Sequence, residues 1–112
     1  MIRQVVFYKH HFFEFYEQQT EKVQERIDYV LELIANVERV PVSYLKHLEG
    51  TDGLFEVRIQ SGSNIFRIFC CFDEGRLVVL FNGFQKKTEK TPKQELEKAE
   101  RLKQEYFNDK RK

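Results

Sequence analysis

Apolar and polar positions follow a strand-like pattern at the start of the chain and a helical period soon after it. Residues 2–8 are rich in β-branched and aromatic types, which indicates a first strand. Residues 10–19 carry several aromatic side chains and predict a short helix. From Thr20, a candidate N-cap, apolar residues recur at spacings of three and four, so a longer helix is expected to follow and to end by Pro41.

The second half of the chain predicts an antiparallel meander and a last helix. Its three strands are expected at residues 54–61, 64–73 and 76–84, joined by short polar turns. Residues 42–53 form the connection that precedes them. Thr91, Pro92 and Gln94 suit the N-cap, the first helical position and the capping-box position of a final helix. The pattern therefore predicts one α+β domain over residues 1–112, in the order β-α-α-β-β-β-α, with the meander packed on helices.

The first turn of the meander sets which side chains share a face of the sheet. The dipeptide Gly62-Ser63 suits a two-residue type II′ turn, which leaves one face of the hairpin apolar and places Arg58 opposite Arg67 on the other. Such a like-charge pair costs up to about 1 kcal/mol in a sheet, so an anionic group is expected beside it. Glu56 lies on the same face and could neutralise one arginine.

The second turn extends this polar row to the third strand. Glu74-Gly75 fits a two-residue turn, which brings Asn82 opposite Arg67 and continues the apolar face through Leu77, Val79 and Phe81. Lys86 falls on the side of the row. Arg58, Arg67 and Asn82, with Lys86 beside them, are a candidate anion site; a solvated surface is the alternative interpretation.

Composition restricts where a nucleic acid could bind. A chain of 112 residues with a net charge of +1 has little overall attraction for a polyanion. From residue 84 onward, however, ten Lys or Arg residues stand against six Asp or Glu residues, so any phosphate-binding role must be local. We see neither a signal peptide nor a membrane span, because Arg67 interrupts the longest apolar run, and we expect a cytoplasmic protein.

The side chains available favour phosphoryl transfer. Motifs of serine hydrolases, nucleotide-binding loops and zinc hydrolases are absent. The three histidines have no cysteine or carboxylate at metal-site spacing, so we predict no metal and no cofactor. Guanidinium groups bind the negative charge that gathers on nonbridging phosphate oxygens, and RNA supplies its own nucleophile, the 2′-hydroxyl. An arginine cluster could therefore cut RNA without a metal or a side-chain nucleophile.

Three segments carry a resemblance to a known family. They are YLKHLEGTDGLFEVRI, FRIFCCF and LVVLFNGFQKKTEKTPKQELEKAERL, at residues 44–59, 66–72 and 77–102. They resemble the phage-derived, HigB-like branch of the RelE/ParE toxin superfamily of type II toxin–antitoxin systems. The resemblance implies a RelE-like fold and an mRNA interferase, an endoribonuclease that enters the ribosome and inhibits translation. It also implies three partners: the ribosome, mRNA and a cognate helix-turn-helix antitoxin. Neither a membrane nor a small-molecule ligand is implied.

The same resemblance assigns roles to individual residues. Arg67 matches the family's arginine on the middle strand of the meander, and Lys86 lies where members place a basic residue after the last strand; we expect both to stabilise transition-state charge. His47 is the candidate general acid or base, because a histidine titrates near neutral pH. An ordinary, partly exposed loop histidine is the other interpretation. The residues expected to bind the RNA are Lys46, Arg58, Asn82 and Lys87.

Two other functions stay open. A ParE-like toxin shares the fold but poisons DNA gyrase by binding it, without nuclease activity. A binding module could likewise keep the fold and lack any activity. ParE-like chains generally lack the catalytic residues, so Arg67 and the pair Lys86-Lys87 favour the nuclease.

Overall fold

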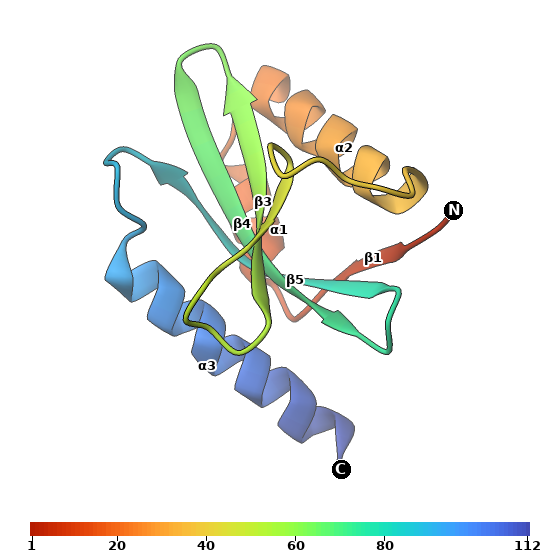
Figure 1. Cartoon of the computed structure of the whole chain (residues 1–112). Helices are drawn as coiled ribbons and strands as arrows, with labels where there is room; N and C mark the ends of the chain where they lie inside the picture. Colours follow the sequence, from red (N-terminus) through yellow and green to blue (C-terminus); the bar gives the residue numbers. More distant parts are fainter.

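The computed structural model describes residues 1–112, and its elements follow the predicted order with one addition (Figure 1). The elements are β1 (Gln4–Phe7), α1 (His11–Glu17), α2 (Glu21–Asn36), β2 (Leu45–His47), β3 (Leu54–Ser61), β4 (Asn64–Asp73), β5 (Leu77–Lys86) and α3 (Lys93–Lys110). The addition is β2, a three-residue strand within the stretch that the sequence predicted as a connection.

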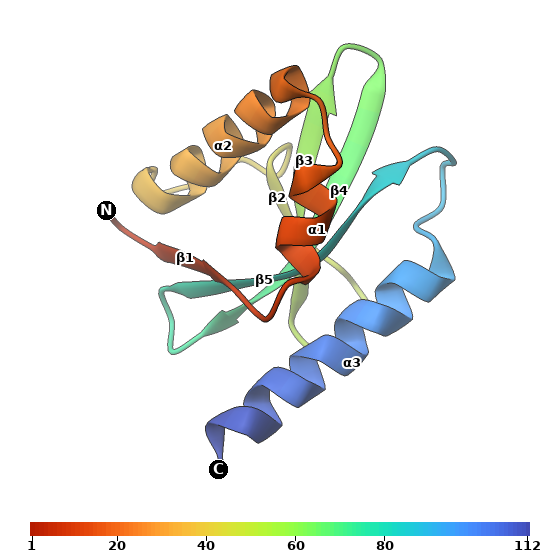
Figure 2. The ribbon, with the colours of Figure 1, turned by 180° about the vertical axis from the view of Figure 1, so that it is seen from behind.

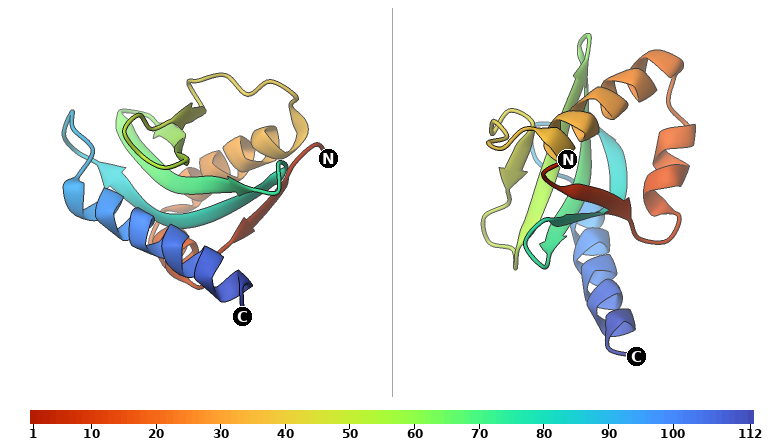
Figure 3. Two further views of the ribbon diagram at one scale, coloured as in Figure 1. Left: turned by 60° about the horizontal axis from the view of Figure 1, so that its bottom comes forward. Right: turned by 90° about the vertical axis from the view of Figure 1, so that its right-hand side faces the viewer.

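All five strands belong to one sheet, in the order β1-β5-β4-β3-β2. The strands β3, β4 and β5 form the predicted antiparallel meander, β1 lies parallel to β5, and β2 extends the opposite edge beside β3. Helices α1 and α2 lie against one face of the sheet, and α3 crosses the other face (Figures 2 and 3). The chain thus has three layers: two helices, the sheet and a single helix.

Each face of the sheet buries its own apolar cluster. On the first face, α1 and α2 contribute Phe12, Phe15, Val23, Ile27, Val30 and Ile34, which pack on Val57, Ile68 and Leu80. On the second face, Ala99 and Leu102 of α3 pack on Leu54, Phe69, Cys71, Val79, Phe81 and Phe84. Fully burying one such aliphatic or aromatic side chain is worth about 1.5–3 kcal/mol. The sequence predicted only the first of these clusters on the sheet.

The ends of the helices differ in part from the prediction. Thr20 caps α2 as expected, because its hydroxyl accepts a hydrogen bond from the Val23 N–H at 3.3 Å. The helix ends at Asn36, however, before Pro41. The backbone becomes extended at Val37, with a ψ of 129°, and the Arg3 guanidinium donates to the Ile34 and Val37 carbonyls at 3.0 and 2.7 Å. The N-terminal segment therefore closes this helix end.

The start of α3 is one residue later than predicted. The N-cap is Pro92, with an extended ψ of 127°, and no side chain caps the helix. Thr91 was expected there, but its hydroxyl makes no capping hydrogen bond. Proline has a fixed φ and no N–H, so Pro92 takes the extended N-cap conformation without leaving a backbone donor unpaired.

The register of the first hairpin is as predicted, and that of the second is not. Ser61 pairs with Asn64 across Gly62-Ser63, and Arg58 pairs with Arg67. The second turn has three residues rather than two, because Asp73 pairs with Leu77, and Glu74 and Gly75 both adopt positive φ, 49° and 80°. This shift of one residue moves Leu77, Val79 and Phe81 to the α3 side of the sheet.

A bulge in β5 then adds a second shift. Ile68 pairs with Gly83 while Cys70 pairs with Leu80, so two residues of β5, Phe81 and Asn82, stand opposite the single residue Phe69. Beyond the bulge, Gly83 passes so close to α1 that a Cβ there would lie 2.5 Å from the Phe15 ring. Only glycine allows β5 to run under α1 at this point.

Candidate functional site

The face of the sheet that carries α3 has two parts, which we call the covered half and the open half. The covered half is the apolar cluster beneath α3, and it lies toward the β4–β5 turn. The open half lies toward the β3–β4 turn, where the hairpin extends beyond α3 (Figure 1). The charged side chains of the open half are Glu56, Arg58, Arg67 and Lys86.

Strand pairing brings these charged residues together. Arg58 and Arg67 are direct partners in adjacent strands, and Glu56 is two residues before Arg58 on the same face. In β5, Lys86 pairs with Ile65, two residues from Arg67, so Lys86 and Arg67 are diagonal neighbours on one face. The two arginines and the lysine that the sequence placed together therefore do share a face.

Glu56 is the anion that the like-charge pair requires. The residue is 4% exposed; its Oε1 lies 3.6 Å from the Nε of Arg58, and its Oε2 lies 3.6 Å from the Nε of Arg67. It therefore pairs with both arginines, where the sequence suggested one. Both contacts are made through Nε, and the terminal nitrogens of Arg58 make no hydrogen bond within the chain.

Arg67 is a buried cation that the chain satisfies only in part. The residue is 6% exposed. Its Nη1 donates to the Phe66 carbonyl at 3.1 Å, while its Nε has no hydrogen-bond partner. Burial lowers the pKa of Arg67, and the charge of Arg58 lowers it further, against the opposing effect of Glu56. A guanidinium still keeps its proton at neutral pH, so the site presents a fixed positive charge with unused donor capacity.

Arg67 lines two hollows of the surface at once. We call the first the lysine hollow; it lies between the β3–β4 turn and the end of β5, and its walls include Arg67, Asn64, Lys86, Lys87 and Thr88. We call the second the arginine hollow; it lies at the edge of β3, and its walls include Arg67, Arg26, Ser43, Tyr44, Arg58 and Gln60. Arg67 therefore stands between two cationic depressions.

The two candidates from the connection lie on opposite faces. Lys46 pairs with Glu56, so its side chain is on the face of the open half, where it is exposed. His47 pairs with Phe55, and the two rings contact each other with centroids 5.1 Å apart. Phe55 packs on the apolar cluster beneath α1 and α2. The structure thus places His47 across the sheet from Arg67.

Asn82 does not belong to the row, because the bulge moves it away and Phe84 pairs with Arg67 instead. It is 2% exposed, and its Nδ2 donates to the backbone carbonyl and to the Oε1 of Glu95, both at 3.0 Å. Asn82 therefore fastens the first turn of α3 to the sheet. The predicted pairing of Asn82 with Arg67 is wrong.

Two residues that no sequence pattern indicated lie at the edge of β3, beside the open half. Arg26 comes from α2 and Tyr44 precedes β2, and both line the arginine hollow with Arg58 and Arg67. The Arg58 N–H donates to the Tyr44 carbonyl at 2.8 Å, which extends the β2–β3 pairing by one step. No local pattern marks either residue, because their proximity depends on how α2 and β2 meet the edge of β3.

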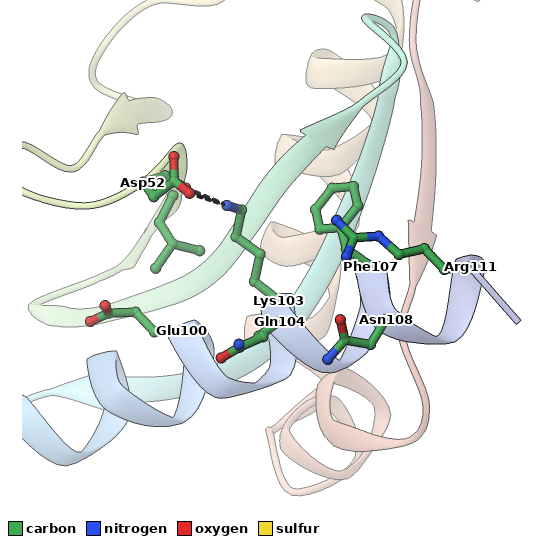
Figure 4. Close-up of a pocket in the computed structure, with 8 residues that line it drawn as sticks. Asp52, Glu100, Lys103, Gln104, Phe107, Asn108 and Arg111 are labelled. Carbon is green, nitrogen blue, oxygen red and sulfur yellow. Dashed lines mark hydrogen bonds and ion pairs between the residues drawn. The ribbon is translucent and has the colours of Figure 1, made fainter.

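A separate hollow lies at the far end of α3, against the loop between β2 and β3 (Figure 4). Lys103 reaches from the helix to the Asp52 carboxylate at 3.5 Å, and Phe107 and Arg111 continue the same wall. This hollow shares no lining residue with the lysine hollow or the arginine hollow. The Lys103–Asp52 pair ties the loop to α3.

Metal-ligand and membrane signals are lacking in the fold. No three side chains of His, Cys, Asp or Glu come together in a way that could hold a metal ion. None of the helices combines the length and the apolar character that crossing a membrane requires.

Known proteins resemble this chain in sequence and in fold. The model of the family described as "Phage derived protein Gp49-like" matches residues 14–104. The fold is similar to that of one chain in the crystal structure of the archaeal RelE-RelB complex from Pyrococcus horikoshii. The TM-score is 0.55 and the sequence identity 17%, over 74% of this chain and 93% of the matched chain. No curated protein matches the sequence significantly. At this low identity, the structural likeness concerns the fold alone.

Proposed function

The chain belongs to the phage-derived Gp49-like family, a family of RelE/HigB-type toxins with the RelE-like fold, and from this premise we propose that it cuts mRNA on the ribosome. In this proposal the 2′-hydroxyl of one nucleotide gives its proton to water as its oxygen attacks the adjacent phosphorus. The bond from phosphorus to the 5′-oxygen of the next nucleotide breaks, and this oxygen takes a proton from water. The products are a 2′,3′-cyclic phosphate and a free 5′-hydroxyl. The step needs no metal, because side chains supply the positive charge.

The observation that carries the proposal is the environment of Arg67. Its Nε faces Glu56 at 3.6 Å and its Nη1 donates to the Phe66 carbonyl, while its Nη2 makes no hydrogen bond within the chain, and Lys86 is its diagonal neighbour. Fixed donors in a site with little water stabilise developing negative charge more strongly than donors in bulk water. Arg67 and Lys86 therefore bind the nonbridging oxygens of the phosphate that is cut, with the phosphate seated in the lysine hollow.

The neighbouring cations hold the RNA strand in place. Arg58 has terminal nitrogens that its pairing with Glu56 leaves free, and Lys46 and Lys87 are exposed at the margins of the open half. They bind the phosphates that flank the cut. His47 lies on the other face of the sheet, so we give it no part in proton transfer, and catalysis in this proposal rests on charge stabilisation.

The open half also suits the antitoxin. The similar archaeal structure is a complex of RelE with RelB. In our proposal a cognate helix-turn-helix antitoxin places acidic side chains over Arg58, Lys46 and Lys86, where it excludes the mRNA. Complementary charge steers such partners together quickly and makes their binding sensitive to salt.

The test is cleavage of a reporter mRNA by the purified chain on programmed ribosomes, with cut sites mapped by primer extension. We expect cuts within translated codons, no cuts in ribosome-free mRNA, and a loss of about 10²- to 10³-fold in rate for Arg67→Ala. The control is Arg101→Ala, which removes an exposed arginine of α3 that makes no ion pair. Full activity of Arg67→Ala would refute the proposed role. Intact mRNA together with cleaved plasmid DNA would indicate a gyrase poison.

A further inference from the structure

The arginine hollow has walls of a different chemistry from those of the lysine hollow. Its volume is about 410 Å³, within the range of small-ligand pockets. Three arginines, Arg26, Arg58 and Arg67, and one tyrosine, Tyr44, are among its lining residues. Arginine beside an accessible aromatic ring is the combination that binds single-stranded nucleic acid.

Arg26 is held in place without being neutralised. Its Nε donates to the Gln60 carbonyl at 3.3 Å, which attaches α2 to the end of β3. Its guanidinium carbon lies 4.9 Å from the centre of the Tyr29 ring and 6.0 Å from that of the Tyr44 ring. None of the ion pairs of the chain includes Arg26. Its charge therefore remains available to an anion.

The hollow carries an excess of positive charge. Glu56 is the only carboxylate within ion-pair distance of Arg58 or Arg67, and none approaches Arg26. Three guanidinium groups thus share one carboxylate. Tyr44 packs against the apolar cluster beneath α1 and α2 and stays partly exposed at the wall. The hydrogen bond from the Arg58 N–H to its carbonyl keeps the tyrosine beside that arginine.

We propose that the arginine hollow binds one nucleotide of the RNA strand, next to the phosphate that is cut. Its base stacks on Tyr44, and its phosphate is bound by Arg26 and Arg58. This inference rests on the proposed function, which places the phosphate that is cut at Arg67. Because Arg67 lines both hollows, an RNA strand bound there passes from the lysine hollow into the arginine hollow. Stacking of this kind tolerates any base but requires an unpaired strand.

The probe is a fluorescein-labelled six-nucleotide RNA with 2′-O-methyl groups, which cannot be cut because its 2′-oxygens are blocked. Binding to the full chain is followed by fluorescence anisotropy at several salt concentrations. We expect Tyr44→Leu to weaken binding by about 5- to 150-fold, which is the usual range for loss of one base–aromatic stack. Tyr44→Phe keeps the ring and binds like the wild type.

The same titrations test Arg26. Arg26→Gln should weaken binding and reduce the slope of log affinity against log salt by about 0.7, because one phosphate contact to a single strand is lost. Arg39→Gln is the matched control: Arg39 is exposed beyond α2 and makes no hydrogen bond or ion pair. It should leave the slope unchanged. Thermal unfolding of each variant checks that the fold is intact.

The outcomes separate this inference from the proposed function. Three results would each overturn the inference. The wild type does not bind the probe; Tyr44→Leu and Arg26→Gln bind it as tightly as the wild type; or the wild type binds a duplex as tightly as the single-stranded probe. Cleavage of mRNA on ribosomes with any of these results would leave the proposed function standing. Ring- and arginine-dependent binding without cleavage would support the inference and contradict the nuclease.

Discussion

The covered half and the open half of the α3 face are built from the same strands and have opposite chemistry. In β3 the change from apolar to charged takes two residues, from Leu54 to Glu56, and in β4 it also takes two, from Phe69 to Arg67. Helix α3 packs on the apolar side of this boundary and leaves the other side open. A rigid sheet thus holds the candidate charges at fixed separations, while the adjoining cluster stabilises the sheet.

The two halves also differ in how completely their polar groups are paired. At the margin of the covered half, the Asp73 carboxylate accepts hydrogen bonds from Tyr106 at 2.7 Å and from Lys110 at 2.6 Å. In the open half, Glu56 Oε2 and Arg67 Nε are buried and face each other at 3.6 Å, too far apart for a hydrogen bond, and Asn82 Oδ1 at the first turn of α3 also has no partner. Buried polar atoms are nearly always paired in stable proteins. The charged pairs of the open half are therefore looser than those around Asp73.

The largest expected effect lies in the covered half. Phe69 is fully buried beneath α3. Phe69→Ala should lower the free energy of unfolding by about 3–5 kcal/mol, because it removes a ring and leaves a cavity. Urea unfolding measures the change. Val42→Ala, at an exposed position, is the control and should stay within about 0.5 kcal/mol of the wild type. A loss below about 1 kcal/mol for Phe69→Ala would show that α3 contributes little to stability.

A smaller effect is expected from removing the anion of the open half. Glu56→Gln leaves Arg58 and Arg67 facing each other without a carboxylate, and we expect a loss of about 1–3 kcal/mol in the free energy of unfolding. Sulfate should restore part of this loss by binding between the two arginines. Glu49→Gln, at an exposed carboxylate without an ion pair, should show neither effect. Equal stabilisation by sulfate of the wild type and Glu56→Gln would contradict the anion site.

The Asp73 carboxyl, at the margin of the covered half, should make the stability of the chain depend on pH in the acid range. Hydrogen bonds from Lys110 and Tyr106 lower the pKa of the Asp73 carboxyl. A carboxyl whose pKa is lower in the folded chain stabilises the fold above its unfolded pKa of about 4, and this stabilisation is lost as the pH falls through the folded pKa. We expect the urea concentration at the unfolding midpoint to decrease as the pH is lowered below about 4. The decrease should be less steep in Asp73→Asn.

The comparison for that experiment is Glu89→Gln, which alters an exposed carboxylate of the loop before α3. This variant should keep the acid dependence of the wild type. If Asp73→Asn and the wild type lose stability in parallel, the contacts of Asp73 with Lys110 and Tyr106 do not couple its proton to folding.

The smallest effects are expected at the exposed margins of the open half. Lys46→Gln and Lys87→Gln should each raise the KM for programmed ribosomes by about 2- to 5-fold and leave kcat unchanged, because exposed charge pairs contribute about 0.2–1 kcal/mol. The effect should vanish at high salt. Lys22→Gln, on the exposed side of α2, is the control. A change in kcat would place either lysine at the reacting phosphate.

The first hairpin was predictable because its turn fixes its register. The dipeptide Gly62-Ser63 allows few turn types, and the pairing of Arg58 with Arg67 follows from it by counting. Thr20 likewise allowed the start of α2 to be predicted, because its hydroxyl caps the helix through a local hydrogen bond. These features depend on neighbours in the sequence, so the sequence alone was sufficient to predict them.

The second hairpin was not predictable in the same way. Its turn includes Arg76, and its bulge at Phe81 and Asn82 arises where β5 must pass beneath α1 and also meet α3. The turn and the bulge each shift the register by one residue, so Arg67 pairs with Phe84, two residues beyond the predicted Asn82. An even shift leaves Lys86 on its predicted face of the sheet but moves Asn82 away from Arg67. The separation of His47 from Arg67 likewise depends on β2, which is too short to show an alternating pattern.

The parallel pairing of β1 with β5 has a consequence for the order in which the chain assembles. Gln4 pairs with Leu77 and Phe7 with Leu80, so β1, the first strand to be synthesised, cannot pair until β5, the last strand, has been made. Contacts between such distant segments form late, because a long loop must close first. During synthesis the sheet therefore stays open at β1 until most of the chain has been made, and the charged face is complete only when the protein itself is nearly finished.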